Sequence, residues 1–184
     1  MKRVVILGAG TAGTMMANHL NHDLDKNKWE IDIIDEREEH YYQPGYLFLP
    51  FDIYEPEDIV KPIRQFIPKR VRLLTDKIEM IDADANLVRM ANGDRLHYDV
   101  LIIATGAKIA PEEVEGMNGS EWQQSIFDFY TFEGALALRN KLREWEGGKL
   151  VVHITEMPIK CPVAPLEFAF LADSYFRHKH MRDK

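Results

Sequence analysis

The sequence contains a single cysteine, Cys161, among its 184 residues. A disulfide within the chain is therefore excluded, and Cys161 is either a packed apolar residue or a reactive thiol. Long apolar runs are also missing, because none approaches the roughly 18 residues that would span a bilayer. The start, MKRVVILGAG, resembles a secretory signal only until it meets a glycine loop, so we expect a cytoplasmic protein.

Positive charge is scarce as well. The chain has 23 Lys and Arg against 30 Asp and Glu, which gives a net charge of -7. Binding to nucleic acid needs a concentrated basic face, so nucleic acid is not expected as a partner. The one basic cluster, FRHKHMRDK at residues 176–184, is typical of the solvated C-terminal end of a helix. No metal site is predicted.

The patterns that are present predict an α/β fold. Residues 3–8 and 29–36 are apolar runs typical of buried strands, and residues 14–25 between them are typical of a helix. Strand, helix and strand in this order form a βαβ unit with a parallel sheet. Beyond it we expect an irregular aromatic segment, a helix at 56–67, a hairpin at ANGD (91–94), a strand at 100–106, a helix at 131–146, a strand at 147–154 and a helix from about Pro162.

Gly8, Gly10 and Gly13 form a G-x-G-x-x-G loop between the first strand and the first helix. The first glycine permits a tight turn, the second lets a pyrophosphate approach the backbone, and the third lets helix and strand pack closely. Asp35 follows 22 residues after Gly13, where its carboxylate can bind ribose hydroxyls. An acid there favours FAD or NAD over NADP. The predicted cofactor contacts in this region are Gly8, Ala9, Gly10, Thr11, Ala12, Gly13, Asp35 and Glu36.

The stretch YDVLIIATGA at 98–107 decides between the two dinucleotides. A domain for NAD alone would continue with further βαβ units after residue 36, whereas this chain has the aromatic segment and the hairpin. Asp99, Ala104, Thr105 and Gly106 match the second FAD motif of flavoproteins with two dinucleotide domains. We therefore predict a Rossmann-like FAD-binding domain at 1–110, with a parallel sheet and an inserted β-hairpin. Residues 111–184 would be a linker helix and the start of a second dinucleotide-domain-like unit.

In such a second unit another glycine loop should follow the strand at 147–154. The chain has TEMPIKCPVAPLE (155–167) there, without a glycine, so a nicotinamide cofactor is not expected as electron donor. Cys161 precedes Pro162, a suitable first helical residue, so the helix dipole and Lys160 would both favour the thiolate. Glu167 stands where the motif has a glutamate. Leu166, Ala169 and Phe170 are expected to form a buried helix stripe.

Three stretches, VVILGAGTAG, HYDVLIIATGAKIA and PIKCPVAPLE, resemble sulfide:quinone oxidoreductases and the related flavocytochrome sulfide dehydrogenases, in order and over the whole chain. The resemblance implies that FAD takes electrons from sulfide and passes them to a membrane quinone. It implies that Cys161 carries sulfur beside the flavin and that Pro44 lies in a segment that approaches the flavin ring. It adds FAD contacts at Lys77 and Ile78, and a peripheral membrane association of full-length members.

Two departures accompany this resemblance. Phe127 stands where some members have a further cysteine, and members are considerably longer than this chain. The chain is therefore interpreted as an N-terminal fragment or truncated form, with the partner cysteine beyond Lys184. Glu167 or Lys160 would handle protons, or each is structural. An NADH:quinone oxidoreductase and a non-catalytic FAD-binding or sulfur-carrying fragment stay open as alternatives, and so does a homo-oligomer.

Overall fold

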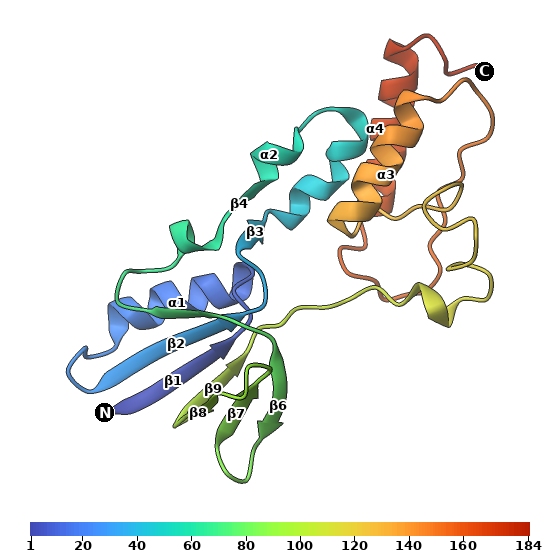
Figure 1. The fold of residues 1–184 in the computed structure, drawn as a ribbon. Coiled ribbons are helices and arrows are strands. Elements are labelled where there is room, and N and C mark those ends of the chain that lie inside the picture. Colours follow the sequence, from blue (N-terminus) through green and yellow to red (C-terminus); the bar gives the residue numbers. More distant parts are fainter. The chain divides into compact units, whose positions relative to one another are not determined.

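Strand β1 (Lys2–Leu7) is the centre of a four-stranded parallel sheet in the computed structural model, which describes all residues 1–184. It pairs with β2 (Trp29–Asp35) on one side and β9 (Val100–Ile103) on the other, and β5 (Arg72–Thr75) pairs with β2. Helix α1 (Thr11–Asp23) connects β1 to β2 (Figure 1). The strand order β5-β2-β1-β9 confirms the predicted α/β fold with a parallel sheet.

The two faces of this sheet are covered differently. On one face Val4, Ile6, Ile31 and Ile33 pack with Ala17 of α1 in one buried cluster. On the other face the sheet packs against an antiparallel sheet (Figure 1). The strands of that sheet are β6 (Ile78–Asp82), β7 (Leu87–Met90) and β8 (Arg95–His97). The predicted hairpin at ANGD joins β7 to β8, with Gly93 in the left-handed region at φ +91°.

Charged side chains occupy that second face near the start of the strands. Asp32 is buried on β2 and accepts hydrogen bonds from Arg72 Nε at 2.7 Å and from Arg72 Nη2 at 2.8 Å. The hydrogen bond to Asp32 raises the pKa of Arg72. Arg3 on β1 donates to Glu30 at 2.7 Å. Alternation along the strands places these charges on the face of Val5 and Leu7, so ion pairs fill the part of that face nearest the strand starts.

The predicted helix at 56–67 is wrong beyond its first turn. Helix α2 spans only Pro56–Ile59, and Val60–Pro62 forms strand β4, antiparallel to β3 (Glu39–Tyr41). A short 3₁₀ helix, Ile63–Phe66, follows. Pro62 explains the break, because proline lacks the N–H that an interior helical turn needs and disfavours helical backbone at the residue before it.

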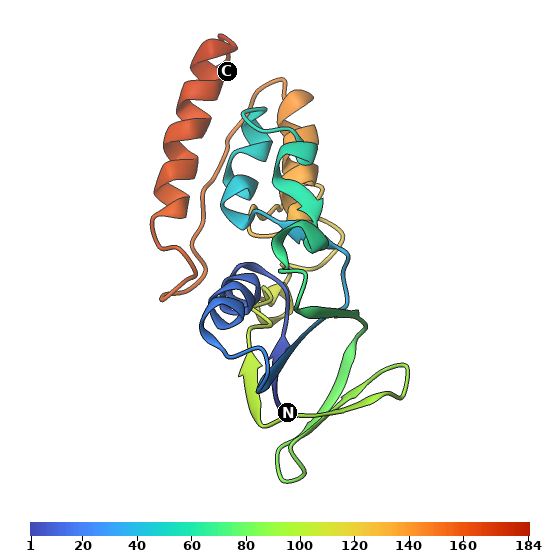
Figure 2. The same ribbon diagram turned by 90° about the vertical axis from the view of Figure 1, so that its left-hand side faces the viewer.

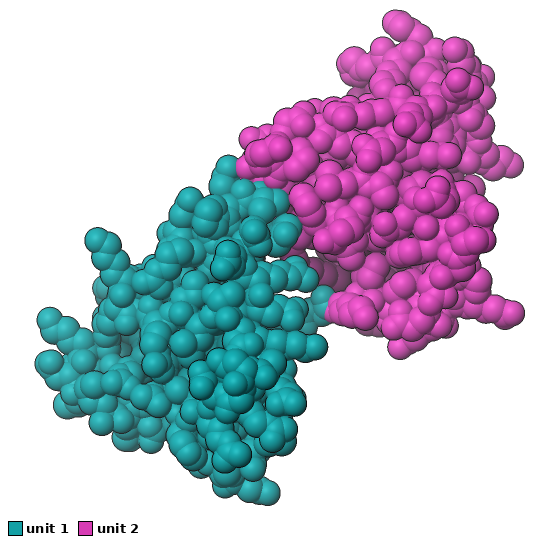
Figure 3. Space-filling model, in the orientation of Figure 1, with its two compact units in different colours: residues 1–41, 60–107 teal, residues 42–59, 108–184 magenta.

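The chain divides into two units, with residues 1–41 and 60–107 in unit 1 and residues 42–59 and 108–184 in unit 2 (Figure 3). The sequence-based division at residue 110 lies close to the second boundary. It did not separate Tyr42–Ile59 from the residues on either side, because assignment to a unit depends on contacts far along the chain. The segment contains two 3₁₀ helices, Gln43–Leu47 and Leu49–Phe51, whose Leu47 and Phe51 belong to the core of unit 2.

Unit 2 is built around helices α3 (Phe132–Arg143) and α4 (Ala164–His178). A 3₁₀ turn at Pro111–Glu113 precedes them. Thr131 caps α3 by accepting a hydrogen bond from Gly134 N at 3.0 Å. The core combines Leu138 and Leu142 of α3 with Phe168, Ala172 and Phe176 of α4. None of the helices in the structure has both the length and the apolar character required to cross a membrane.

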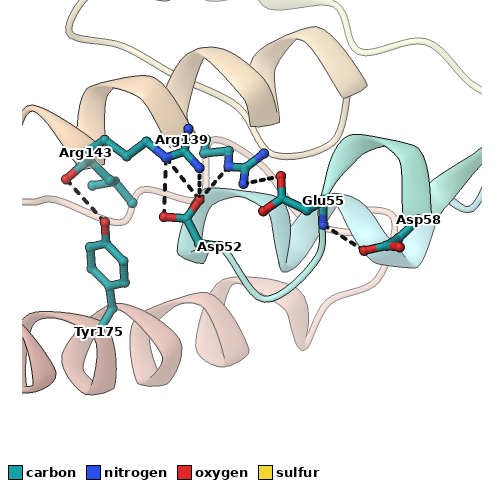
Figure 4. Close-up of polar contacts among 7 residues, drawn as sticks. Asp52, Glu55, Asp58, Arg139, Arg143 and Tyr175 are labelled. Atoms are coloured by element: carbon teal, nitrogen blue, oxygen red, sulfur yellow. Dashed lines mark hydrogen bonds and ion pairs between the residues drawn. The ribbon is translucent and has the colours of Figure 1, made fainter.

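A charged cluster joins α3 to the Tyr42–Ile59 segment (Figure 4). Arg139 is only 4% exposed and donates from Nε to Asp52 Oδ1 at 2.6 Å and from Nη2 to Glu55 Oε2 at 2.8 Å. Arg143, one turn later, donates to Asp52 Oδ1 at 2.6 Å. Partial burial alone would raise the pKa of Asp52, but hydrogen bonds from Arg143 and Arg139 outweigh it, so the pKa lies below its usual value.

Two expectations for the C-terminal part are wrong. Residues 147–154 form no strand, and Figures 1 and 2 show them as an irregular connection. A strand exists only where its backbone pairs with a neighbour, and no strand of unit 2 lies beside this segment. The predicted stripe of Leu166, Ala169 and Phe170 is exposed rather than buried, with Leu166 62% and Phe170 76% exposed, because Phe168, Ala172 and Phe176 face the core instead.

Candidate dinucleotide loop and thiol loop

In unit 1 the glycine loop lies at the carboxyl edge of the parallel sheet. Gly8 follows β1 and donates its N–H to Ile34 O of β2 at 2.7 Å. Its φ is +92°, and a Cβ there would lie 2.5 Å from Ala104 O. A Cβ on Gly13 would lie only 1.8 Å from Gly8 O. These two glycines are therefore required by turn geometry and by the close approach of helix α1 to the loop.

Gly10 has a different environment. A Cβ on Gly10 would meet nothing within 4 Å, so the space beside the loop is open. Gly10 is the N-cap of α1, no side chain caps this helix end, and its first turn contains no acidic residue. Thr11 and Ala12 in that turn are exposed. Free N–H groups at the positive end of a 13-residue helix fit the pyrophosphate of a dinucleotide.

Asp35 ends β2 and contacts the glycine loop directly. Its Oδ2 accepts the N–H of Ala9 at 2.6 Å, and its Oδ1 accepts the N–H of Arg37 at 2.9 Å. A carboxylate has about four acceptor positions. Two of these remain for ribose hydroxyls, so the predicted binding role is compatible with the observed structural one. Glu36, the next residue, is exposed.

Residues of the second motif lie next to the same loop. Ala104 follows β9 and donates its N–H to Leu7 O at 2.8 Å, and Gly106 adopts a left-handed φ of +77°. Thr105 is exposed. Asp99 lies at the other end of β9, where it accepts the N–H of Arg3 at 2.6 Å. The structure therefore brings Ala104, Thr105 and Gly106 to the loop and gives Asp99 a separate role in fixing the start of β1.

Lys77 and Ile78 follow β5 at the same edge of the sheet. Asp76 donates its N–H to Asp35 O at 2.9 Å, which continues the pairing of β5 with β2. Lys77 is exposed, whereas Ile78 packs against the cluster on the second face of the sheet.

Sequence reasoning missed His40. Its Nδ1 lies 3.2 Å from Ala9 O, and its ring contacts Phe66 with centroids 4.6 Å apart. His40 stands in the aromatic stretch EEHYYQ, where no spacing rule distinguishes it from its neighbours. In the structure His40 lies on β3, which pairs with β4.

In unit 2 the remaining predicted residues gather around the thiol loop, residues 155–163. Cys161 is exposed and has a left-handed φ of +57°. Helix α4 begins at Ala164, two residues later than expected, and Ala164 N donates to Cys161 O at 3.1 Å. The side chain of Lys160 donates to Gln43 Oε1, one residue before Pro44. The structure thus brings the Pro44 segment to the thiol loop across 117 positions of sequence.

Glu167 and Phe127 have ordinary surroundings. Glu167 is exposed in the first turn of α4, where the helix dipole stabilises a negatively charged side chain. Phe127 packs partly buried against the core of unit 2. No group of three or more His, Cys, Asp or Glu side chains is arranged to hold a metal ion.

Several known proteins that this chain resembles are oxidoreductases. A mitochondrial sulfide:quinone oxidoreductase from Dictyostelium discoideum is 27% identical over 99% of this chain and 40% of its own length. The solved sulfide:quinone oxidoreductase from Aquifex aeolicus matches 99% of this chain and 41% of its own, with 26% identity and a TM-score of 0.75. A type II NADH:quinone oxidoreductase from Staphylococcus aureus is 28% identical, over 66% of this chain and 30% of its own length.

The chain spans about two fifths of the length of the sulfide:quinone oxidoreductases that it matches, and the resemblance to them seen in the sequence is confirmed over the whole chain. A sequence profile described as pyridine nucleotide-disulphide oxidoreductase matches residues 2–153. Members of that family and the sulfide:quinone oxidoreductases are FAD-binding flavoproteins, which confirms FAD as the expected cofactor. The glycine loop, the parallel sheet behind it and this match together show that the chain belongs to the pyridine nucleotide-disulphide oxidoreductase family.

Proposed function

We propose that the chain forms part of an FAD-dependent enzyme that oxidises sulfide and passes the electrons to a quinone. The observation that carries this proposal is the thiol loop. Where a second dinucleotide loop would need glycines, residues 155–163 contain two prolines and an exposed cysteine. The similarity to two sulfide:quinone oxidoreductases over 99% of this chain supports the same substrate class.

The residues of unit 1 would bind the cofactor. The free N–H groups of Thr11 to Gly13 would receive the pyrophosphate, and Asp35 would accept hydrogen bonds from a ribose. Thr105 and Gly106 would line the same edge of the sheet. Bound FAD would supply a two-electron acceptor that a quinone then reoxidises.

Cys161 would carry the sulfur. Its thiolate and a hydrosulfide ion form one S–S bond, and the S–H bond of the hydrosulfide breaks. The step leaves a persulfide on Cys161 and releases one proton to water. The two electrons would pass to FAD. Exposure of the thiol allows hydrosulfide to reach it. Lys160 and Glu167 are the candidates for handling the proton that lie nearest to Cys161 in the sequence. Both residues are exposed.

An anaerobic titration tests this function. The purified chain is loaded with FAD, sulfide is added, and the visible flavin absorbance is followed in the native chain and in Cys161→Ala. We expect sulfide to bleach the native flavin and to leave the Cys161→Ala flavin oxidised, with equal FAD content in both. Equal bleaching in the two proteins would remove Cys161 from the chemistry.

The second candidate is NADH oxidation, which the similarity to a type II NADH:quinone oxidoreductase over 66% of the chain favours. The missing glycines at 155–163 oppose it, since pyrophosphate needs a close approach to backbone. The same titration with NADH in place of sulfide separates the two. We expect no bleaching by NADH, and a rapid bleaching by NADH with none by sulfide would reverse the assignment.

A further inference from the structure

The backbone of Cys161 adopts a conformation that cysteine rarely takes. Its φ is +57°, in the left-handed region where a Cβ crowds the following carbonyl group. Glycine is the usual residue there, and asparagine or aspartate are the common exceptions. Strained residues of this kind persist only where their surroundings hold them, and they gather at functional sites. The contacts that hold Cys161 in this conformation are therefore part of the site.

One support comes from the start of helix α3. Tyr130 donates its hydroxyl to Cys161 O at 3.4 Å. The tyrosine is itself fixed, because Asp128 Oδ1 accepts its backbone N–H at 2.9 Å and its ring contacts Phe129 with centroids 5.1 Å apart. Burial raises the pKa of Tyr130, with a further contribution from Cys161, so its hydroxyl keeps the proton that it donates.

The second support comes from the Tyr42–Ile59 segment. Gln43 accepts a hydrogen bond from the ammonium group of Lys160, the residue before the thiol. Gln43 begins a 3₁₀ helix whose next residue, Pro44, has a fixed φ and whose following residue, Gly45, is buried against Ile59. The glutamine is therefore presented from a rigid base rather than from a loose loop.

We propose that Tyr130 and Gln43 are positioning residues that hold the thiol loop in the conformation seen here, so that Cys161 is presented to its reaction partner in one orientation. The two supports act on either side of the peptide bond between Lys160 and Cys161. The hydrogen bonds of both residues go to groups other than the sulfur, so neither is assigned a chemical step. This assignment rests on the proposed role of Cys161.

The lone cysteine allows a direct measurement. A nitroxide label attached to Cys161 reports the motion of the loop on the nanosecond scale, without FAD or sulfide. We expect Tyr130→Phe and Gln43→Ala to shorten the rotational correlation time of the label about twofold or more. Gln43→Glu keeps an acceptor for Lys160 and should restore the native spectrum.

Ser125→Ala is the matched control, because it likewise removes one exposed side-chain hydrogen bond in unit 2, which joins Ser125 to Glu121 and not to the thiol loop. Far-UV circular dichroism during heating would check that all variants stay folded. Label spectra of Tyr130→Phe and Gln43→Ala that equal the native spectrum would overturn the proposal, as would an equal change in Ser125→Ala.

A sulfide titration of the FAD-loaded, unlabelled proteins then links position to chemistry. We expect Tyr130→Phe and Gln43→Ala to slow flavin bleaching about threefold to tenfold at unchanged FAD affinity, as displaced reacting groups do. Gln43→Glu should bleach at the native rate. Bleaching at native rates in both loosened variants would overturn the positioning role. Absence of bleaching in the native chain would instead overturn the proposed function, and the label spectra would still decide whether the two residues hold the loop.

Discussion

Gly10 and Gly13 are the same residue type, three positions apart, yet their surroundings give them different tasks. A Cβ on Gly13 would lie 1.8 Å from Gly8 O, whereas a Cβ on Gly10 would meet nothing within 4 Å. We expect Gly13→Ala to destabilise unit 1 by about 2 kcal/mol or more through overpacking. Gly10→Ala should leave stability within about 0.5 kcal/mol and weaken FAD binding.

Urea unfolding and FAD fluorescence quenching measure these two effects separately. The opposite pattern, with a destabilised Gly10→Ala and a native-like Gly13→Ala, would show that the loop geometry described here is incorrect. Equal FAD affinity in Gly10→Ala and the native chain would show that the open side of Gly10 is not where the cofactor lies.

The left-handed backbone of Cys161 gives a second residue-scale prediction. Glycine takes a φ of +57° without crowding, whereas alanine does not, so Cys161→Gly should be more stable than Cys161→Ala by about 1 kcal/mol. Thermal unfolding of the two variants in parallel measures the difference. A more stable alanine variant would mean that the loop relaxes to another conformation once the thiol is removed.

At the scale of elements, helix α4 has two apolar faces, and the periodicity of its sequence did not identify the one that is buried. Phe168 is 3% exposed and Phe170 is 76% exposed, although both are phenylalanines on one helix. We expect Phe168→Ala to cost about 3–5 kcal/mol through the cavity that it leaves. Phe170→Ala should change stability by less than about 0.5 kcal/mol. Denaturant unfolding of this matched pair would contradict the packing if the two losses were equal.

The charged cluster between α3 and the Tyr42–Ile59 segment predicts a pH dependence. Because the folded pKa of Asp52 is lowered below its ordinary value of 3.8, its contribution to stability is complete above that value. The contribution is lost as the pH falls through the lower, folded pKa. Asp52→Asn should therefore destabilise unit 2 at pH 7 and show a smaller further loss at pH 3 than the native chain. Urea midpoints at the two pH values test this, and parallel losses would count against it.

Local signals predicted the elements that need only local information. The β1–α1–β2 unit, the ANGD hairpin and the helix α3 each depend on neighbouring residues, and each is confirmed. The failures depend on distant contacts. Val60–Pro62 is a strand because β3 lies beside it, residues 147–154 are irregular because no strand does, and Phe170 is exposed because Phe168 faces the core.

At the scale of the whole molecule, each unit has a core of its own. The two clusters of unit 1 and the cluster of unit 2 share no residue. Trp29 lies in unit 1, whereas Trp122 and Trp145 lie in unit 2. The fluorescence of Trp29→Phe reports unit 2 alone, and that of a Trp122→Phe, Trp145→Phe double variant reports unit 1 alone. We expect the urea transitions of these two proteins to have different midpoints. Coincident midpoints would show one cooperative unit.

Asp35 holds the glycine loop through the N–H of Ala9, a hydrogen bond between residues of the chain itself. The loop is thus shaped by the chain's own residues, and a dinucleotide bound there would spend less of its binding free energy on ordering it. Affinity in such a site depends on how long the ligand stays, while its rate of arrival is governed by diffusion and charge. One carboxylate at the end of β2 would therefore act on the lifetime of the holoprotein more than on the rate at which it assembles.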